Sequence, residues 1–193
     1  MNIKHYSTKE AYDYLMQTAL DGRDELISKY CVLAVNEMRN AETPASTSKH
    51  HVYRGGLLVH TAEVVNYAMN LGFFCEEDDF EALSYAAILH DHRKVADYEW
   101  ASPASPELAG KWVKTEHGKQ IYHISDGYAK FYAAMVNHPN KELVNKIYHC
   151  ILSHHGRPEW GSPIEPQTHI AGILHMADHW SAFGGPGKIK PNA

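Results

Sequence analysis

The chain has 193 residues, of which 44% are hydrophobic and 21% are charged, a composition typical of a globular protein and not of a disordered chain. No apolar run approaches the roughly 20 residues that span a bilayer, and the N-terminal segment lacks the apolar stretch of a secretory signal. The formal net charge of −5 argues against general binding of long nucleic acid. The three cysteines are scattered, as in proteins with reduced thiols, so we expect a cytoplasmic protein without a membrane partner.

Helical periodicity dominates the sequence, and strand-like alternation is nearly absent. A capping box from Ser7 to Glu10 predicts the start of the first helix. Helices are expected at about 7–22, 24–40, 56–72, 79–96, 125–136, 141–155 and 168–182, with loops at 41–49 and 101–111. The sequence shows no repeat and no convincing linker. It therefore predicts one all-α domain over residues 1–193, with N-terminal helices in 1–48, a core over 49–182 and a flexible tail over 183–193.

Histidine is unusually frequent, with 15 residues dispersed along the chain. It is the commonest metal ligand and a frequent acid or base in catalysis. On the helix predicted at 79–96, an apolar stripe ends in three ionisable residues at helical spacing, His90, Asp91 and Lys94. Burying such groups is unfavourable unless they are paired or bind a metal. A carboxylate between an imidazole and a lysine suits a divalent metal ion with an anionic ligand nearby.

Three other predicted helices show the same change from apolar to metal-binding residue types along one face. The residues are His60 on the third helix, His154 and His155 on the sixth, and Asp178 on the last. A lone histidine on an apolar face is more often a hydrogen-bonded core residue. Because four helices each present such a group, we expect a buried metal centre inside a helical bundle.

Five segments resemble the HD-domain metal-dependent phosphohydrolases: GGLLVHTAEV at 55–64, AILHDHRKVADY at 87–98, IYHISDG at 121–127, ILSHHGRPEWGSP at 151–163 and ILHMADHWSA at 173–182. Within this family, the sequence is most similar to the HD module of YhaM-type 3′–5′ exoribonucleases, over about residues 49–182. KHHVYRGG and SHHGRPEWGSP are the more specific features. The resemblance implies an all-α HD bundle with a buried metal centre. We expect these 193 residues to lack the β-barrel that precedes this module in those exonucleases, which would count against processive degradation of RNA.

The resemblance implies a centre of two divalent transition metal ions. The first would be held by His60, His90, Asp91 and Asp178, and Asp91 would bridge to a second held by His123 and His154. Such ligands accept manganese, iron, cobalt, nickel or zinc. A two-metal centre generates hydroxide near neutral pH and stabilises an in-line displacement at phosphorus. His123 precedes Ser125, which we expect to cap the helix at 125–136.

Two further residues receive catalytic roles from the resemblance, in addition to Asp91. Lys94 matches the lysine of the family motif and would neutralise charge that gathers on the phosphoryl oxygens. His155 would either protonate the leaving group or bind a metal ion. His51 is also expected near the site.

Three arginines are candidates for substrate binding. Arg54 and Arg157 would either contact phosphate and base or be ordinary surface residues. The chain departs from the family at His92 and Arg93, where relatives have isoleucine and glycine. Arg93 lies three residues after His90, so it either reaches the pocket mouth and binds a phosphate or marks a rearranged local packing. His92 is expected to point away from the metal ions.

These residues favour metal-dependent hydrolysis of a phosphoester in a nucleotide or short oligonucleotide through a metal-activated hydroxide. One alternative is a di-iron oxygenase on the same scaffold, which oxygen consumption would distinguish. Another is a degenerate module that senses nucleotides without turnover, a reading that the altered residues at 92 and 93 suggest. The expected partner is a small phosphorylated substrate, and the sequence does not define the oligomeric state.

Overall fold

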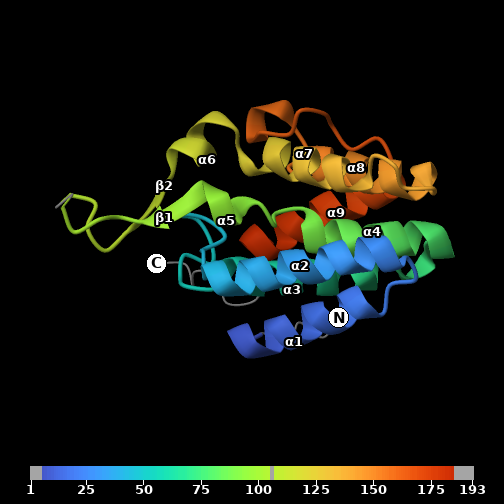
Figure 1. Cartoon of the computed structure of the whole chain (residues 1–193), viewed down its shortest axis with the longest axis horizontal. Helices are drawn as coiled ribbons and strands as arrows, with labels where there is room; N and C mark the ends of the chain where they lie inside the picture. The colour runs from blue at the N-terminus through green and yellow to red at the C-terminus, as the bar shows by residue number, and fades with distance from the viewer. Residues whose placement is uncertain (1–5, 105–106, 185–193) are drawn as a thin grey trace.

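The computed structural model describes residues 6–104 and 107–184, which form a helical bundle with a small projecting β-hairpin (Figure 1). The helices in chain order are α1 (Thr8–Leu20), α2 (Glu25–Ala41), α3 (Gly56–Leu71), α4 (Glu77–Leu89), α5 (Lys94–Asp97), α6 (Glu116–Gln120), α7 (His123–Met135), α8 (Lys141–Ser153) and α9 (His169–His179). Short helical turns are η1 (Gly72–Phe74), η2 (Pro158–Trp160) and the π-helical η3 (Trp180–Gly184). The predicted all-α class is confirmed. Of the tail predicted at 183–193, residues 185–193 lie outside the described residues.

The first two helices begin where the sequence predicts, because side chains bind their free N-terminal amides. The Ser7 hydroxyl accepts a hydrogen bond from the backbone N–H of Glu10, and the Glu10 carboxylate accepts one from the backbone N–H of Ser7. Asp24 accepts a hydrogen bond from the backbone N–H of Ile27 at the start of α2. These two caps fix the first residues of α1 and α2.

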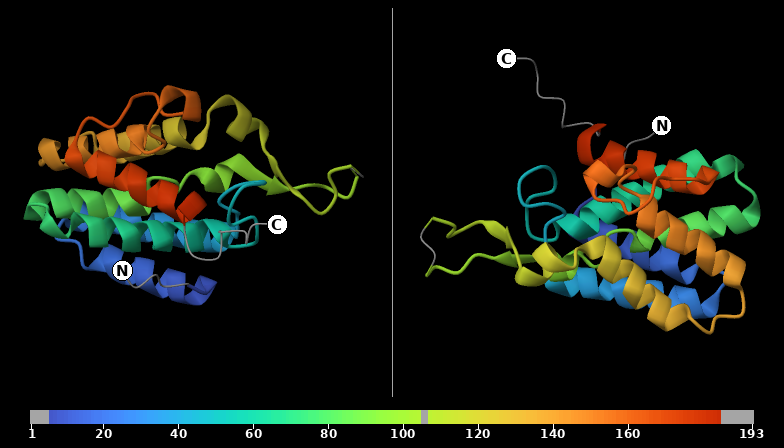
Figure 2. Two further views of the ribbon diagram at one scale, coloured as in Figure 1. Left: turned by 180° about the vertical axis from the view of Figure 1, so that it is seen from behind. Right: turned by 90° about the horizontal axis from the view of Figure 1, so that it is seen from above.

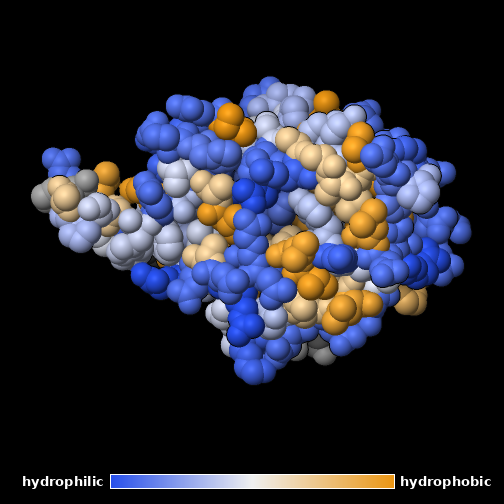
Figure 3. Space-filling model, viewed as in Figure 1, coloured by the Kyte–Doolittle hydropathy of each residue, from blue (hydrophilic) through white to orange (hydrophobic). Residues whose placement is uncertain are grey.

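Helices α3 and α4 form the centre of the bundle, and α1, α2, α8 and α9 pack around them. Leu57 and Leu58 on α3 and Leu83 and Ile88 on α4 are completely buried. Each such side chain contributes about 1.5–3 kcal/mol through burial, so this core stabilises the packing of the two central helices. The outer face over α1 and α2 mixes apolar with hydrophilic side chains (Figure 3). Among the described residues, no helix is both long and apolar enough to cross a bilayer.

The helix predicted at 79–96 is interrupted: α4 ends at Leu89, residues 90–93 form a turn, and α5 begins at Lys94. Two imidazoles account for the end of the helix. Nδ1 of His90 donates to the carbonyl of Ala87 at 2.8 Å, and Nδ1 of His92 donates to the carbonyl of Leu89 at 2.6 Å. In a continuing helix, these carbonyls would accept from backbone amides four residues later. The resulting turn carries Asp91 into the protein interior.

The hairpin and the short α6 were not predicted from the sequence. Strand β1 (Tyr98–Trp100) pairs antiparallel with β2 (Trp112–Lys114), and residues of the predicted loop at 101–111 connect them. Strands of three residues are too short to show an alternating pattern. The hairpin projects from one end of the bundle in each view (Figures 1 and 2).

The predicted cap at Ser125 is wrong, because α7 begins two residues earlier, at His123. The carboxylate of Asp97, at the end of α5, accepts a hydrogen bond from the backbone N–H of His123 at 3.2 Å. Asp97 therefore caps α7 from a distant segment of the chain. Such a cap leaves no trace in the local sequence of α7.

Candidate metal centre

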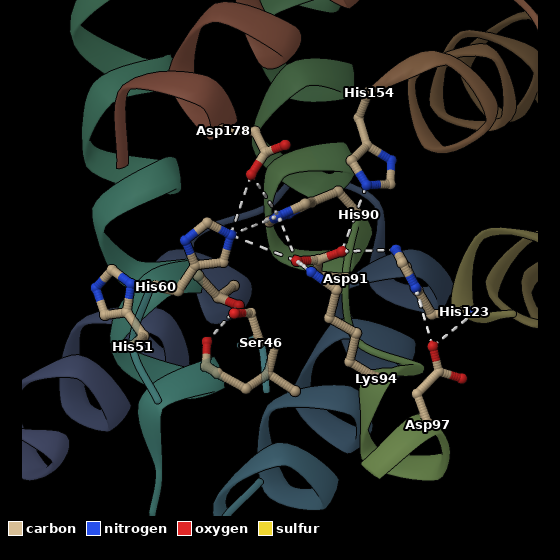
Figure 4. Close-up of polar contacts among 12 residues, drawn as sticks. Ser46, His51, His60, His90, Asp91, Lys94, Asp97, His123, His154 and Asp178 are labelled. Atoms are coloured by element: carbon tan, nitrogen blue, oxygen red, sulfur yellow. Dashed lines mark hydrogen bonds and ion pairs between the residues drawn. The ribbon is translucent and has the colours of Figure 1, made fainter. Parts of the chain in front are cut away.

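Six side chains converge inside the bundle, from α3, α4, α7, α8 and α9 or the turns that follow these helices (Figure 4). They are His60, His90, Asp91, His123, His154 and Asp178. The first five of these residues are at most 1% exposed. The sequence predicted all six as metal ligands, and the fold brings them together.

Asp91 lies between two groups of imidazoles, and each of its carboxylate oxygens faces one group (Figure 4). Oδ2 of Asp91 lies 3.4 Å from Nε2 of both His60 and His90. Oδ1 lies 3.1 Å from Nε2 of His123 and 3.4 Å from Nε2 of His154. A carboxylate in this position is able to bridge two cations.

Backbone carbonyls fix the orientation of two of these imidazoles. Nδ1 of His90 donates to the carbonyl of Ala87, and Nδ1 of His154 donates to the carbonyl of Ile151, each at 2.8 Å. A carbonyl only accepts hydrogen bonds, so Nδ1 carries the proton in both rings. In the neutral ring, Nε2 therefore holds a lone pair directed at Asp91.

Side chains fix the other two imidazoles in the same way. Nδ1 of His123 lies 3.1 Å from the carboxylate of Asp97. Nδ1 of His60 lies 2.9 Å from the hydroxyl of Ser181, and this hydroxyl donates to the carboxylate of Glu63 at 2.7 Å. Both Nδ1 atoms are therefore donors, which leaves Nε2 as the acceptor. Outer hydrogen bonds of this kind are a regular feature of histidines that bind metal ions.

The inward-facing atoms fit a metal ion better than they fit one another. Among the described residues, Oδ1 of Asp91 and Nε2 of His123 and His154 are buried and have no hydrogen-bond partner. Acceptors at 3.1–3.4 Å repel one another unless a cation or a proton lies between them. Imidazole nitrogen and carboxylate oxygen are ligands that divalent transition metals prefer. The donor set therefore suits such ions on both sides of Asp91.

Fixed charges stabilise the ionised form of the central carboxylate. The Lys94 ammonium lies 2.6 Å from Oδ2 of Asp91, and both side chains are buried. Burial alone would raise the pKa of Asp91, but Lys94, His90 and His123 together hold that pKa well below its usual range. Burial alone would lower the pKa of Lys94, but the negative charge of Asp91 outweighs this effect. The pKa of Lys94 is therefore raised above its usual value. At neutral pH, Asp91 is therefore an anion beside a fixed cation.

A cavity of about 550 Å³ opens onto this centre, a volume typical of small-molecule sites. Lys94, His155 and Asp178 line the cavity at the centre, where Oδ1 of Asp178 lies 3.1 Å from Nε2 of His60. The remaining wall is rich in aromatic and basic side chains, including Tyr98, Lys114, Tyr122 and Trp160. A phosphorylated substrate would meet positive charge and ring faces in this cavity.

His155 joins the group formed by Asp91, His123 and His154. Its Nδ1 donates to the carbonyl of Trp160 at 2.8 Å, so the neutral ring presents Nε2 as an acceptor. Burial, followed by the neighbouring His154 and His123, lowers the pKa of His155 to about 2. Of the two predicted roles, this arrangement favours metal binding over proton donation.

Arg93 does not line the cavity. Its guanidinium donates to the carboxylates of Asp126 and Glu37, each at 2.7 Å. The neighbouring His92 is buried, and its Nε2 lies 3.4 Å from the hydroxyl of Tyr30, away from both ligand groups. This arrangement favours the rearranged packing that the sequence allowed over a phosphate contact.

Arg54 and Arg157 also lie outside the cavity lining, on the protein surface. The Arg54 guanidinium is 5.7 Å from the ring centre of Trp100, and that of Arg157 is 5.3 Å from the ring centre of Trp160. Both are cation–π distances. The predicted neighbour His51 lies with His50 beside His60, and its Nε2 is 3.2 Å from Glu63.

Sequence reasoning missed the residues that hold the histidines in place, above all Asp97 and Ser181. The sequence contained a signal for both, because Asp97 follows Lys94 by three positions and Ser181 follows Asp178 by three positions. Residues three apart on a helix lie on the same face. Ser181 reaches His60 from the π-helical turn η3, a type of irregularity often found at functional sites. Predicting this turn requires the packing of α9 on α3, which local patterns do not contain.

The chain is similar in sequence to known nucleases. It is 36% identical to the 3′–5′ exoribonuclease YhaM of Bacillus licheniformis over 140 residues, which cover 72% of this chain and 42% of that protein. YhaM of Bacillus subtilis is 34% identical over 148 residues, with 76% and 45% covered, and YhaM of Bacillus pumilus is 31% identical over 173 residues, with 88% and 52% covered. The chain thus spans about half the length of the curated relatives it matches.

Two further comparisons add little. A family model described as "Putative helicase" matches residues 26–95, a segment that includes His60, His90 and Asp91 but ends before the later ligands. No solved structure matches the chain. The predicted likeness is confirmed by the exoribonucleases: over most of its own length, the chain is a homologue of YhaM 3′–5′ exoribonucleases.

Proposed function

We propose that the chain is a metal-dependent phosphohydrolase that cleaves a phosphoester bond in a nucleotide or short oligonucleotide. One observation carries the proposal: oriented imidazoles face both oxygens of the buried Asp91 carboxylate beside a cavity that Lys94 lines. The relatives are named 3′–5′ exoribonucleases, which supports a phosphodiester substrate attacked near its 3′ end.

The residues divide into ligands for two divalent transition metal ions. The first would be held by His60, His90, Asp91 and Asp178, and the second by Asp91, His123, His154 and His155. When bound, such ions supply a hydroxide near neutral pH and stabilise charge at phosphorus. Manganese, iron, cobalt, nickel and zinc all suit these ligand types, so the identity of the ions is a matter for measurement.

The chain itself contributes fixed charge and orientation. The ammonium of Lys94 is held by Asp91 at 2.6 Å and lines the cavity, so its charge is in place before substrate arrives. A preorganised cation stabilises negative charge that grows on the phosphoryl oxygens and needs no rearrangement to do so. The hydrogen bonds from Asp97 and Ser181 keep His123 and His60 directed inward.

The relatives favour hydrolysis over an oxygenase, because each of the three described above carries the name of a nuclease. The altered residues His92 and Arg93 are the reason to consider a sensing module without turnover, but His92 points away from both ligand groups. Arg93 binds Asp126 and Glu37 outside the cavity lining and leaves the ligand set in place. No observation therefore favours the sensing alternative.

The proposal is tested by comparing the wild-type protein with Asp91→Asn and with Asp13→Asn, a matched change at an exposed carboxylate. The substrates are a 5′-labelled hexaribonucleotide and bis(p-nitrophenyl) phosphate, each with added manganese or one of the other four metals. We expect the wild type and Asp13→Asn to hydrolyse both, and Asp91→Asn to lose at least about 100-fold in rate. Full activity of Asp91→Asn, or an inactive wild type with every metal, would overturn the proposal.

A further inference from the structure

The β-hairpin continues one wall of the cavity outward. Tyr98 on β1 lies opposite Lys114 on β2, and both side chains line the cavity. Residues two apart on a strand point to the same face of the sheet. Trp100 and Trp112, which are also paired, therefore share the face of Tyr98 and Lys114, one step further from the cavity.

The ring contacts agree with this register. The rings of Trp100 and Trp112 meet edge to face, with centroids 5.2 Å apart, and Trp100 is 46% exposed. The intervening Glu99, opposite Val113, alternates to the other face of the hairpin. The face that leads out of the cavity is therefore aromatic and carries no acidic side chain from either strand.

Basic side chains lie beside the aromatic rings of the hairpin and of the cavity. The Arg54 guanidinium lies 5.7 Å from the ring centre of Trp100, and the Lys114 ammonium lies 5.0 Å from the ring centre of Tyr122, which also lines the cavity. The Arg54 side chain is 64% exposed, and its guanidinium pairs at 3.4 Å with the carboxylate of Glu42, which is 58% exposed. Because such an exposed ion pair is weak, a phosphate competes with Glu42 for this guanidinium. Aromatic rings with basic side chains beside them thus extend from the cavity to the outer end of β1.

We propose that this face of the hairpin binds single-stranded RNA whose 3′ end occupies the cavity, with a base stacked on Trp100 and a phosphate bound by Arg54. The inference rests on the proposed function and names its substrate class. Single-stranded nucleic acid is recognised by stacking platforms beside basic grooves, because every base has a ring face and every linkage a negative charge. Duplex ends do not offer the unstacked bases that such a platform needs.

The distance from the cavity to Trp100 determines how many nucleotides a strand needs to reach this ring. Two strand residues advance about 7 Å, which equals about two stacked nucleotides at 3.4 Å each. A dinucleotide whose 3′ end lies beside Lys94 and Asp178, deeper in the cavity than Tyr98, therefore ends before Trp100, whereas a decanucleotide extends past it. Affinity for the longer strand depends on Trp100, and affinity for the dinucleotide does not.

The test measures equilibrium binding by fluorescence anisotropy, with a 5′-fluorescein oligouridylate of ten nucleotides and with the dinucleotide. Phosphorothioate linkages prevent cleavage, so that binding is measured without turnover on the protein as purified. The variants are Trp100→Ala, Trp100→Phe, which keeps a ring, and Arg54→Ala. Phe74→Ala is the matched control, because it removes an exposed ring at the other end of α3 from Arg54. Bound metal per chain verifies that each variant is folded.

We expect Trp100→Ala to weaken decanucleotide binding at least about fivefold and to leave dinucleotide binding within about twofold. Trp100→Phe retains most of the affinity, Phe74→Ala retains all of it, and Arg54→Ala reduces the salt dependence by about 0.7 in the logarithmic slope. An unchanged decanucleotide affinity in Trp100→Ala, or an equal loss for both lengths, overturns the inference. An inactive wild type that still binds through Trp100 would refute the proposed function alone.

Discussion

Asp97 offers the sharpest test of how the centre is organised. It is fully buried and accepts two hydrogen bonds from His123, one from Nδ1 at 3.1 Å and one from the backbone N–H at 3.2 Å. In Asp97→Asn, the amide oxygen still accepts both bonds, so the cap of α7 and the ring orientation survive. Only the negative charge behind His123 is lost, and with it part of the basicity of Nε2.

The size of the effect follows from these contacts. Loss of an outer carboxylate typically lowers metal affinity about 10- to 100-fold, or about 1.4–2.8 kcal/mol. Asp97→Ala removes both hydrogen bonds and adds the loss of a helix cap, about 1 kcal/mol of stability. The ligands on the other side of Asp91, among them His60 and His90, do not contact Asp97 in the described structure and keep their affinity.

The assay is a calorimetric titration of metal-free protein with manganese or cobalt. We expect two binding steps in the wild type and weakening of one step alone in Asp97→Asn. Equal weakening of both steps, or no change in either, would refute the assignment of His123 to a position of its own. Far-UV circular dichroism distinguishes these outcomes from unfolding.

Further predictions concern the other group, the core and pH. Ser181→Ala removes the partner of His60 and weakens the other binding step about 10-fold or more in the same titration. Leu83→Ala lowers the free energy of unfolding by about 2–5 kcal/mol in urea denaturation, whereas Leu33→Ala, at a side chain that is 60% exposed, changes it by less than about 0.5 kcal/mol. Burial lowers the pKa of His92 from 6.5 to about 4, so the unfolded chain binds more protons in that range and stability falls as pH drops through it. His92→Gln should flatten the pH dependence of unfolding of the metal-free protein by up to about 1.4 kcal/mol per pH unit, and an unchanged slope would count against this burial effect.

Much of the fold follows from local patterns in the sequence. The capping box at Ser7 and the cap at Asp24 start α1 and α2 at the expected residues because both devices act within one turn. Apolar residues at helical spacing likewise define α3 and α8. The end of α4 did not follow, because the imidazoles of His90 and His92 bind their own backbone in a way that spacing alone does not reveal.

In the candidate site, too, some residues could be predicted from local sequence patterns and others could not. Five ligand positions (His60, His90, Asp91, His154 and Asp178) followed from ionisable residues at the ends of apolar stripes, and the family resemblance added His123. Asp97 and Ser181, which orient His123 and His60, reach these ligands from other elements, so only the assembled bundle shows their role. The same applies to Arg93, whose partners Asp126 and Glu37 belong to α7 and α2.

The central claim is that Asp91 joins two metal positions, and the most direct measurement is the transition metal bound per chain. Protein purified without oxygen or chelator, then saturated with manganese and desalted, is analysed by elemental analysis beside Asp91→Asn. The account predicts about two ions per chain in the wild type and loss of both upon Asp91→Asn, because one carboxylate serves both positions. A wild-type protein that retains no metal ion, or an Asp91→Asn protein that still holds two, would contradict it.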